Sequence, residues 1–419
     1  MMAFPKMIKI RQRFEAPSIG HIGQTVEEQI NKPEIASRIR PGMRIAITAG
    51  SRGIANIADI IAGVVRELKR HGAVPFIIPA MGSHGGATAE GQVEVLESLG
   101  VTEAYCGAPI FSSMETVQLG TTPGGMAVFM DKYAYEADGV VLVGRIKLHT
   151  DFKSPVGLES GLVKMAAIGL GKHRQALLLH SYGVHGIRDI MPEVGKVVIG
   201  SGRILFGVGV VENASEQTAL LEAIEPERIV AREQELLKRS AEFYPKLPVS
   251  DLDVLIVDQI GKNYSGTGLD TNIIGRMRIQ GTPEPESPRI KYVIACDLSH
   301  ESHGNALGIG LADLTTVRLT SKIDRRITNE NVITSSFLQR ASVPITLDND
   351  REALSAALRA NWNVAEERAR VIRIFSTLHL EHMYVSEVVY EEIRSLPGIS
   401  AEGEWVPLSF DREGNLPPF

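Results

Sequence analysis

Cysteine and long apolar runs are both scarce in this chain. Only two of the 419 residues are cysteines, Cys106 and Cys296, and they form no CxxC pair, so neither a disulfide framework nor a structural zinc site is indicated. No uninterrupted apolar run reaches the ~18 residues that span a bilayer, and the first residues lack the apolar core of a signal peptide. These absences predict a cytoplasmic protein that does not bind membranes.

A surplus of positive charge is lacking as well. The 44 lysines and arginines are outnumbered by 50 aspartates and glutamates, which gives a formal net charge of -6. Nucleic acids and anionic lipids are bound by clustered Lys and Arg, so we expect neither as a partner and favour a small molecule. The composition, 44% hydrophobic and 22% charged, is typical of a globular protein, and the length predicts two domains.

Apolar strands alternate with amphipathic helices over the first half of the chain. We assign strands to residues 44–50, 74–79 and 139–144, a helix to 54–72, and one or two further strands to 196–214. This alternation predicts an α/β fold: two α/β domains with mainly parallel sheets, whose faces are covered by helices.

The domain boundary follows from one amphipathic helix at about residues 226–243, which we interpret as a connector. Its charged run REQELLKR (232–239) is typical of a solvated face. We therefore predict an N-terminal domain over 1–245 and a C-terminal α/β domain over 250–375, with a helix at 303–314. The remaining residues, 376–419, are expected to pack back on the first domain.

Polar side chains directly after the predicted strands are the first candidates for a functional site, because ligands of parallel sheets bind beyond the carboxyl ends of the strands. Arg52 follows the first strand in AGSRG, and its planar guanidinium suits a carboxylate or phosphate. His84 follows the second strand in MGSHGG, and His149 follows the third in GRIKLHTDF. Each residue alone is as readily a surface side chain, but two imidazoles on equivalent loops converge on one crevice and suit acid–base chemistry.

Further candidates are a lysine, a histidine and a QxxK pair. Lys164 lies in an apolar stretch, where burial would make its amine nucleophilic, although a lysine extending to solvent is the commoner case. His180 ends the apolar run ALLLH and is either a metal ligand or a core histidine. Gln259 and Lys262 follow the first strand of the second domain, so we expect them to face the first domain across an interdomain cleft that holds the active site.

Two HxxH pairs, His300/His303 and His379/His382, carry the weakest metal signal. Their spacing places both imidazoles on one helix face, but neither is the HExxH of a metalloprotease, and capping or surface roles are favoured.

In order and separation these residues resemble the lactate-racemase family over roughly 45–268. The matching parts are SR at Ser51 and Arg52, GSH ending at His84, the strand-end His149, Lys164 before MAAIGLG, His180, and QxxK at Gln259 and Lys262.

The resemblance implies a nickel-pincer nucleotide cofactor, a pyridinium-3-thioamide-5-thiocarboxylic acid mononucleotide whose sulfur arms hold nickel. Lys164 would hold it covalently, Ser51 would contact it, and His180 would complete the coordination of the metal. Soft sulfur, carbon and imidazole donors suit nickel(II). Cofactor-maturation proteins are then expected partners, and the oligomeric state is left open.

The activity implied by the resemblance is racemisation or epimerisation at C2 of a 2-hydroxyacid. One of His84 and His149 would remove the hydroxyl proton while hydride leaves C2, and the other would return a proton after the keto acid reorients. Arg52, Gln259 and Lys262 would hold the carboxylate. Glycines after His84 and a longer stretch before Lys164 predict a substrate bulkier than lactate, such as a sugar acid.

Two other classes of function stay open. One is a hydrolase or lyase that uses His84 and His149 with zinc or with no metal. The other is a non-catalytic protein that binds a carboxylated or phosphorylated metabolite, its glycine-rich loops serving as anion nests.

Overall fold

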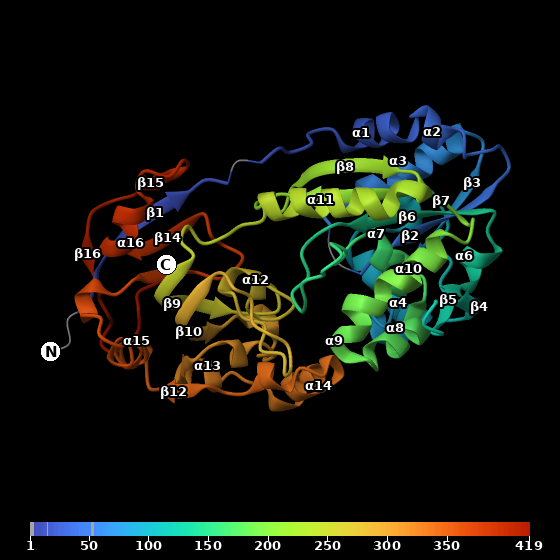
Figure 1. Cartoon of the computed structure of the whole chain (residues 1–419). Helices are drawn as coiled ribbons and strands as arrows, with labels where there is room; N and C mark the ends of the chain where they lie inside the picture. Colours follow the sequence, from blue (N-terminus) through green and yellow to red (C-terminus); the bar gives the residue numbers. More distant parts are fainter. Residues whose placement is uncertain (1–3, 15, 52–53) are drawn as a thin grey trace. The chain divides into compact units, whose positions relative to one another are not determined.

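The computed structural model describes residues 4–14, 16–51 and 54–419 (Figure 1). Contacts between residues divide the chain into two units. One comprises Ala16–Tyr244, and the other joins Met1–Glu15 to Pro245–Phe419. Each unit is a sheet with helices, so the predicted α/β class with mainly parallel sheets is confirmed.

The Ala16–Tyr244 unit is built on a five-stranded sheet of order β3-β2-β6-β7-β8. Neighbouring strands are parallel except β7 and β8, which form an antiparallel pair. The strands are β2 (Arg44–Ala49), β3 (Val74–Pro79), β6 (Gly139–Arg145), β7 (Ile204–Glu212) and β8 (Thr218–Ile224). The three predicted strands that lead to Arg52, His84 and His149 are therefore present and adjacent.

Helices cover both faces of this sheet. On one face α1 (Ile22–Ile30) and α3 (Ile57–Arg70) pack against Ile47 and Val141. On the other face a second core gathers around Leu142, and it receives residues of α7 (Leu162–Lys164), α8 (Lys172–His180), α10 (Met191–Ile199) and α11 (Ile229–Phe243). Because both faces of the sheet are buried, the sequences of these strands are continuous apolar runs.

Smaller elements complete this unit. They are α2 (Pro33–Ala36), α4 (Ala89–Ser98), α5 (Glu103–Cys106), α6 (Lys132–Glu136), α9 (Gly183–His185) and the hairpin of β4 (Thr116–Thr121) and β5 (Ala127–Asp131).

Two predictions for this part of the chain need correction. The stretch 196–214 begins as the end of α10, because a short buried apolar run suits a helix as well as a strand and Pro192 favours a helix start there. The run 232–239 is helical as predicted, but Glu233 on it is buried, so this face is not solvated throughout.

The second unit contains a nine-stranded sheet of order β12-β11-β10-β9-β13-β14-β1-β15, with β16 also beside β1. Its parallel part is β9 (Asp251–Ile260), β10 (Arg289–Leu298), β11 (Leu314–Thr316), β12 (Ile345–Leu347) and β13 (Val371–Ile374). Its antiparallel part is β14 (His382–Ser386), β1 (Lys6–Gln12), β15 (Ile399–Ala401) and β16 (Val406–Pro407). The helices are α12 (Thr271–Ile274), α13 (Val317–Thr320), α14 (Arg325–Ser335), α15 (Asp350–Arg359) and α16 (Glu387–Ile393).

The predicted domain limits are wrong at both ends of the chain. Residues 376–419 were expected on the first domain, yet β14 pairs with β13 and β1 inside the second unit. Strand β1 itself, expected in the 1–245 domain, lies between β14 and β15. Such pairing joins strands some hundreds of residues apart, which no local periodicity reports. The helix expected at 303–314 is also absent, because Gly304 and Gly308 adopt φ of 80° and 102° and only Ile309–Leu311 form a 3-10 turn.

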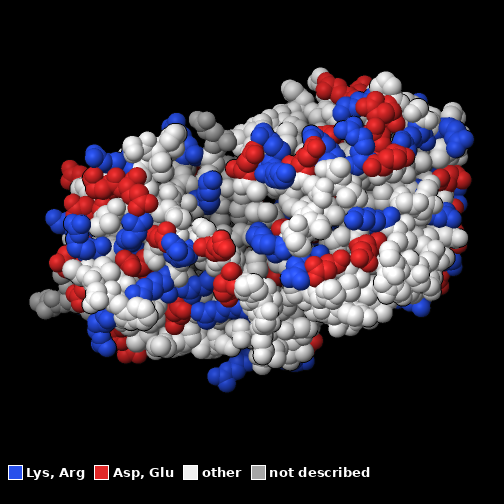
Figure 2. Space-filling model, viewed as in Figure 1, with Lys and Arg blue, Asp and Glu red and all other residues white. Residues whose placement is uncertain are grey.

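The surface carries charges of both signs. On the face seen in Figure 2, acidic and basic side chains are intermingled. Among the described residues, no helix is long and apolar enough to cross a membrane.

Candidate active site

A cavity of about 250 Å³ lies at the carboxyl ends of β2, β3 and β6. Its lining includes Ser51, His84, Arg145, His149, Lys164 and His180. All of these residues belong to the Ala16–Tyr244 unit.

The loop that carries His84 is shaped by glycine. Gly85 has a φ of 64°, and a Cβ there would lie 2.6 Å from the backbone of Gly91 and Gln92. The Gln92 side-chain amide donates hydrogen bonds to the carbonyls of Gly82 and His84, at 3.0 and 3.2 Å. The Nδ1 atom of His84 meets the Ser51 hydroxyl. The imidazole is thereby held between the loops that follow β2 and β3.

His149 is held on both ring nitrogens. Its Nδ1 accepts a hydrogen bond from the Asp151 N–H at 3.0 Å, and its Nε2 lies 2.8 Å from the Lys164 Nζ. The ring also stacks on Phe152, with centroids 4.4 Å apart. Because Nδ1 accepts, the hydrogen of a neutral imidazole resides on Nε2 and points at the lysine amine. An uncharged amine satisfies this arrangement, and that is the nucleophilic form of lysine.

A buried carboxylate supports the His149 loop. Glu159 accepts the His149 N–H at 2.6 Å and the Ser154 N–H at 3.2 Å. Burial raises the pKa of Glu159, and the nearby Lys153 ammonium opposes this shift. Glu159 therefore fixes the backbone on which the imidazole stands.

Lys164 ends α7, and the chain then forms a π-helical turn, Met165–Gly169. Such turns are rare and frequently lie at functional sites. At the start of α7, the Val163 N–H donates to the Glu233 carboxylate of α11 at 2.8 Å. Complete burial raises the pKa of Glu233 to about 7. A Cβ at Gly161 would lie 2.4 Å from this carboxyl group, so glycine is required there.

His180 ends α8 and faces the same cavity. Burial lowers its pKa, and the nearby Asp151 carboxylate opposes the shift. The imidazole is therefore uncharged near neutrality, which is the form that ligates metals.

The structure thus brings together Ser51, His84, His149, Lys164 and His180, as the sequence predicted, and leaves their chemical roles as predictions. Arg52 lies outside the described residues.

The remaining predicted site residues, Gln259 and Lys262, lie in the other unit. Both are at the end of β9: Gln259 accepts a hydrogen bond from the Tyr264 hydroxyl at 2.8 Å, and the Lys262 ammonium donates to the Gly266 carbonyl at 2.6 Å. Their placement facing the first domain stays a prediction.

Sequence reasoning missed other polar residues of the cavity. Arg145 ends β6 and pairs with Glu212, which ends β7 and accepts the Ala55 N–H at 2.6 Å. The rule that located the two histidines, polar residues at strand ends, applies equally to this pair. Lys147 and Asp151 also line the cavity, and they flank His149 in sequence.

The HxxH pairs have local partners. The rings of His300 and His303 are 6.1 Å apart on a tight turn, whereas His379 bonds to Ser376 at 2.8 Å and His382 to Glu402 at 2.9 Å. Among the described residues, no group of three or more His, Cys, Asp or Glu side chains could hold a metal ion.

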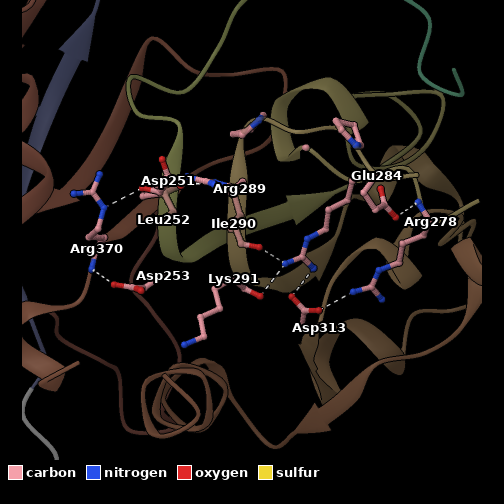
Figure 3. A pocket seen from close by; sticks show the side chains of 14 residues that line it. Asp251, Leu252, Asp253, Arg278, Glu284, Arg289, Ile290, Lys291, Asp313 and Arg370 are labelled. Carbon is pink, nitrogen blue, oxygen red and sulfur yellow. Dashed lines mark hydrogen bonds and ion pairs between the residues drawn. The ribbon is translucent and has the colours of Figure 1, made fainter. Parts of the chain in front are cut away.

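A second cavity, of about 620 Å³, lies in the other unit where β9 and β10 begin (Figure 3). Three of its arginines pair with neighbouring carboxylates: Arg276 and Arg278 with Asp313, and Arg289 with Asp251. These ion pairs hold the ends of strands together, and the first cavity remains the better candidate for catalysis.

A parallel sheet with nucleophilic and acid–base side chains at its carboxyl edge defines the class of α/β enzymes. Residues 10–185 match the family model of the lactate racemase N-terminal domain. No curated protein matches the chain. Among solved structures, lactate racemase apoprotein from Thermoanaerobacterium thermosaccharolyticum is similar at 14% identity with a TM-score of 0.52, over 88% of this chain and 94% of that one.

At that identity the structural match shows the fold alone. The match of residues 10–185 to this family model confirms the resemblance predicted from the sequence. A family of this kind supports a racemase or epimerase, that is, an isomerase.

Proposed function

We propose that this protein racemises or epimerises a 2-hydroxyacid at C2 with a lysine-tethered nickel-pincer nucleotide. The observation that carries the proposal is the contact of 2.8 Å between Lys164 Nζ and His149 Nε2, in a cavity that also receives His84 and His180. A tethering amine, two acid–base groups and a metal ligand then share one small space.

The residues present fit the cofactor. The hydrogen-bond pattern at His149 favours a nucleophilic Lys164 amine, and the lowered pKa of His180 leaves its imidazole available to a metal. Ser51 is within the same cavity as a further contact. When bound, the group would accept hydride from C2 and return it. Cofactor-maturation proteins would supply it.

His84 and His149 would move the hydroxyl proton. The Asp151 N–H occupies Nδ1 of His149, so Nε2 is the atom that exchanges a proton in the cavity. Nδ1 of His84 is likewise occupied by Ser51. Two bases on different loops suit two enantiomers, whose hydroxyl groups lie on opposite sides of C2.

The substrate would be an acid. Arg145 and Lys147 add positive charge to the cavity lining, and Arg52, Gln259 and Lys262 are our proposed carboxylate ligands. From the longer stretch between His149 and Lys164 we propose a hydroxyacid larger than lactate, such as a sugar acid.

Hydride transfer can be tested by isotope retention. The protein, co-produced with cofactor-maturation proteins, is incubated with enantiopure C2-deuterated 2-hydroxyacids of rising size, and both enantiomers are analysed for deuterium. We expect the inverted product to keep deuterium, whereas loss of the label to water would indicate a carbanion route and contradict the proposal. The variant Lys164→Ala is the control. It should lose the covalently bound cofactor, which is measured as added mass on the intact chain, and it should lose the turnover.

A His-based hydrolase is the second candidate, favoured by the contact of the Ser51 hydroxyl with His84 Nδ1, a nucleophile beside a base. Ser51→Ala separates the two functions. A hydrolase would turn over esters without any cofactor and would lose at least about 100-fold of that turnover in Ser51→Ala, whereas a racemase would have no ester turnover that depends on Ser51.

A further inference from the structure

Lys172 is a buried cation outside the cavity lining. Its side chain is fully buried, and its backbone adopts a left-handed φ of 54° at the first position of α8. Burial lowers its pKa, and the Asp131 carboxylate opposes this shift. A buried charge and a left-handed non-glycine residue are each destabilising, and features of this kind persist where surrounding contacts require them.

Two hydrogens of the ammonium group have acceptors at hydrogen-bond distance, and a carboxylate lies beside the group as an ion-pair partner. Lys172 Nζ donates to the Pro79 carbonyl and to the Gln92 Oε1, each at 2.7 Å, and lies 3.5 Å from the Asp131 carboxylate. Pro79 ends β3, directly before the loop that carries His84. Lys172 also begins the helix that His180 ends. One side chain therefore ties the base of the His84 loop to the helix of His180.

The hydrogen bond from Lys172 to Gln92 also orients the side-chain amide of Gln92. Because Gln92 Oε1 accepts from the ammonium, its amide nitrogen faces the opposite way and donates to the carbonyls of Gly82 and His84. Without the ammonium, the amide oxygen loses its buried donor, and the side chain of Gln92 is held less firmly against the carbonyls of Gly82 and His84.

We infer that Lys172 is a positioning residue that acts through Gln92 to hold the loop of His84 in its reactive place. This role in catalysis rests on the proposed function of His84, whereas the ordering of the loop does not. Asp131, Lys172 and Gln92 are all buried, and the ammonium joins the other two by an ion pair and a hydrogen bond, so removal of the ammonium or of the amide should loosen the loop.

The experiment measures hydrogen–deuterium exchange of residues 80–87 in the protein without cofactor. Lys172→Met keeps the length of the side chain and removes the ammonium, and Gln92→Leu removes the amide. The control is Val64→Ala, which opens a cavity in the core on the opposite face of the sheet. We expect both test variants to accelerate exchange at 80–87 by roughly tenfold or more while β6 is unchanged, and the control to leave 80–87 unchanged.

The double variant should accelerate exchange by less than the product of the two single effects, since Lys172 acts on the carbonyls of Gly82 and His84 through Gln92. Equal exchange at 80–87 in Lys172→Met and in the control overturns the inference. If Lys172→Met does not fold, Gln92→Leu decides alone: normal exchange of its loop overturns the inference as well.

The loaded enzyme gives the second readout. Both variants should lower kcat about tenfold or more with KM within about twofold, since the position of an acid–base group acts on the chemical step. An unchanged kcat in a variant whose loop exchanges faster overturns the inference. Failure of the proposed function would be seen separately, as a parent protein that turns over no 2-hydroxyacid.

Discussion

The two histidine loops of the cavity are held in opposite ways. Side-chain donors, Gln92 and through it Lys172, hold the His84 loop by its carbonyls. Side-chain acceptors do the reverse beyond β6, where Glu159 holds the His149 loop by its N–H groups and Glu233 holds α7 in the same manner. Equivalent strand ends can therefore carry the same type of side chain on loops that are held through different backbone groups, carbonyls in one loop and N–H groups in the other. Each loop depends on its own buried charged side chain.

The largest expected effect is on catalysis. Replacing His84 or His149 with Asn removes a proton-transfer group and should lower kcat by at least about 100-fold for one or both enantiomers. Measuring turnover from each enantiomer separately shows whether the two loops serve opposite faces of the substrate. His71→Asn, on a surface histidine bonded to Asn31, is the matched control and should be without effect. Normal turnover in both loop variants would contradict our assignment of the bases.

Glu233 should make stability depend on pH. Its pKa of about 7 in the folded protein lies above the ordinary 4.5, so the proton is held more tightly when folded. The stability it contributes is present below pH ~4.5 and is lost as the pH rises through ~7, up to about 3 kcal/mol. Glu233→Gln still accepts the Val163 N–H and has no proton to lose. Its Tm should therefore rise relative to the parent between pH 5 and 8, and a constant difference would contradict this account.

Replacing Glu159 with Gln should destabilise the protein, unlike the same replacement at Glu233. Both of its oxygens accept backbone N–H groups, and a glutamine offers one acceptor only. Glu159→Gln therefore leaves a buried donor unsatisfied, which costs about 1–3 kcal/mol in the free energy of unfolding. Denaturant unfolding of the two Gln variants at pH 8 compares them directly. We expect the free energy of unfolding to fall in Glu159→Gln and to rise in Glu233→Gln, each relative to the parent protein.

The smallest expected effect comes from replacing the adjacent glycines of the His84 loop, Gly85 and Gly86. Gly85 and Gly86 both have a φ of 64°, but a Cβ at Gly85 meets backbone at 2.6 Å whereas one at Gly86 meets nothing within 4 Å. Gly86→Ala should cost only the about 1 kcal/mol of a left-handed alanine. Gly85→Ala should cost more, because Gly91 and its neighbours must move. Equal midpoints in urea would show that the loop is looser than the contacts with Gln92 indicate.

Much of the candidate site could be predicted from the sequence, because the end of a strand is a local feature. His84 and His149 follow apolar strands directly, and the order of Lys164, His180 and the other motifs carried the resemblance to the family. Glu233 was misassigned to a solvated face because its neighbours are charged, and only packing of α11 on α7 buries it. Lys172 had no local signal, since its partners Asp131 and Gln92 come from separate elements.

The sequence by itself determined the strands that lead to the candidate site, β2, β3 and β6, since apolar periodicity is set by neighbouring residues, and it determined which polar residues follow them. The tertiary structure alone decided that β1 joins the sheet of the Pro245–Phe419 unit and that Lys164 meets His149. These contacts join residues that are distant along the chain, and their free energy depends on burial and hydrogen-bond geometry that exist only after folding.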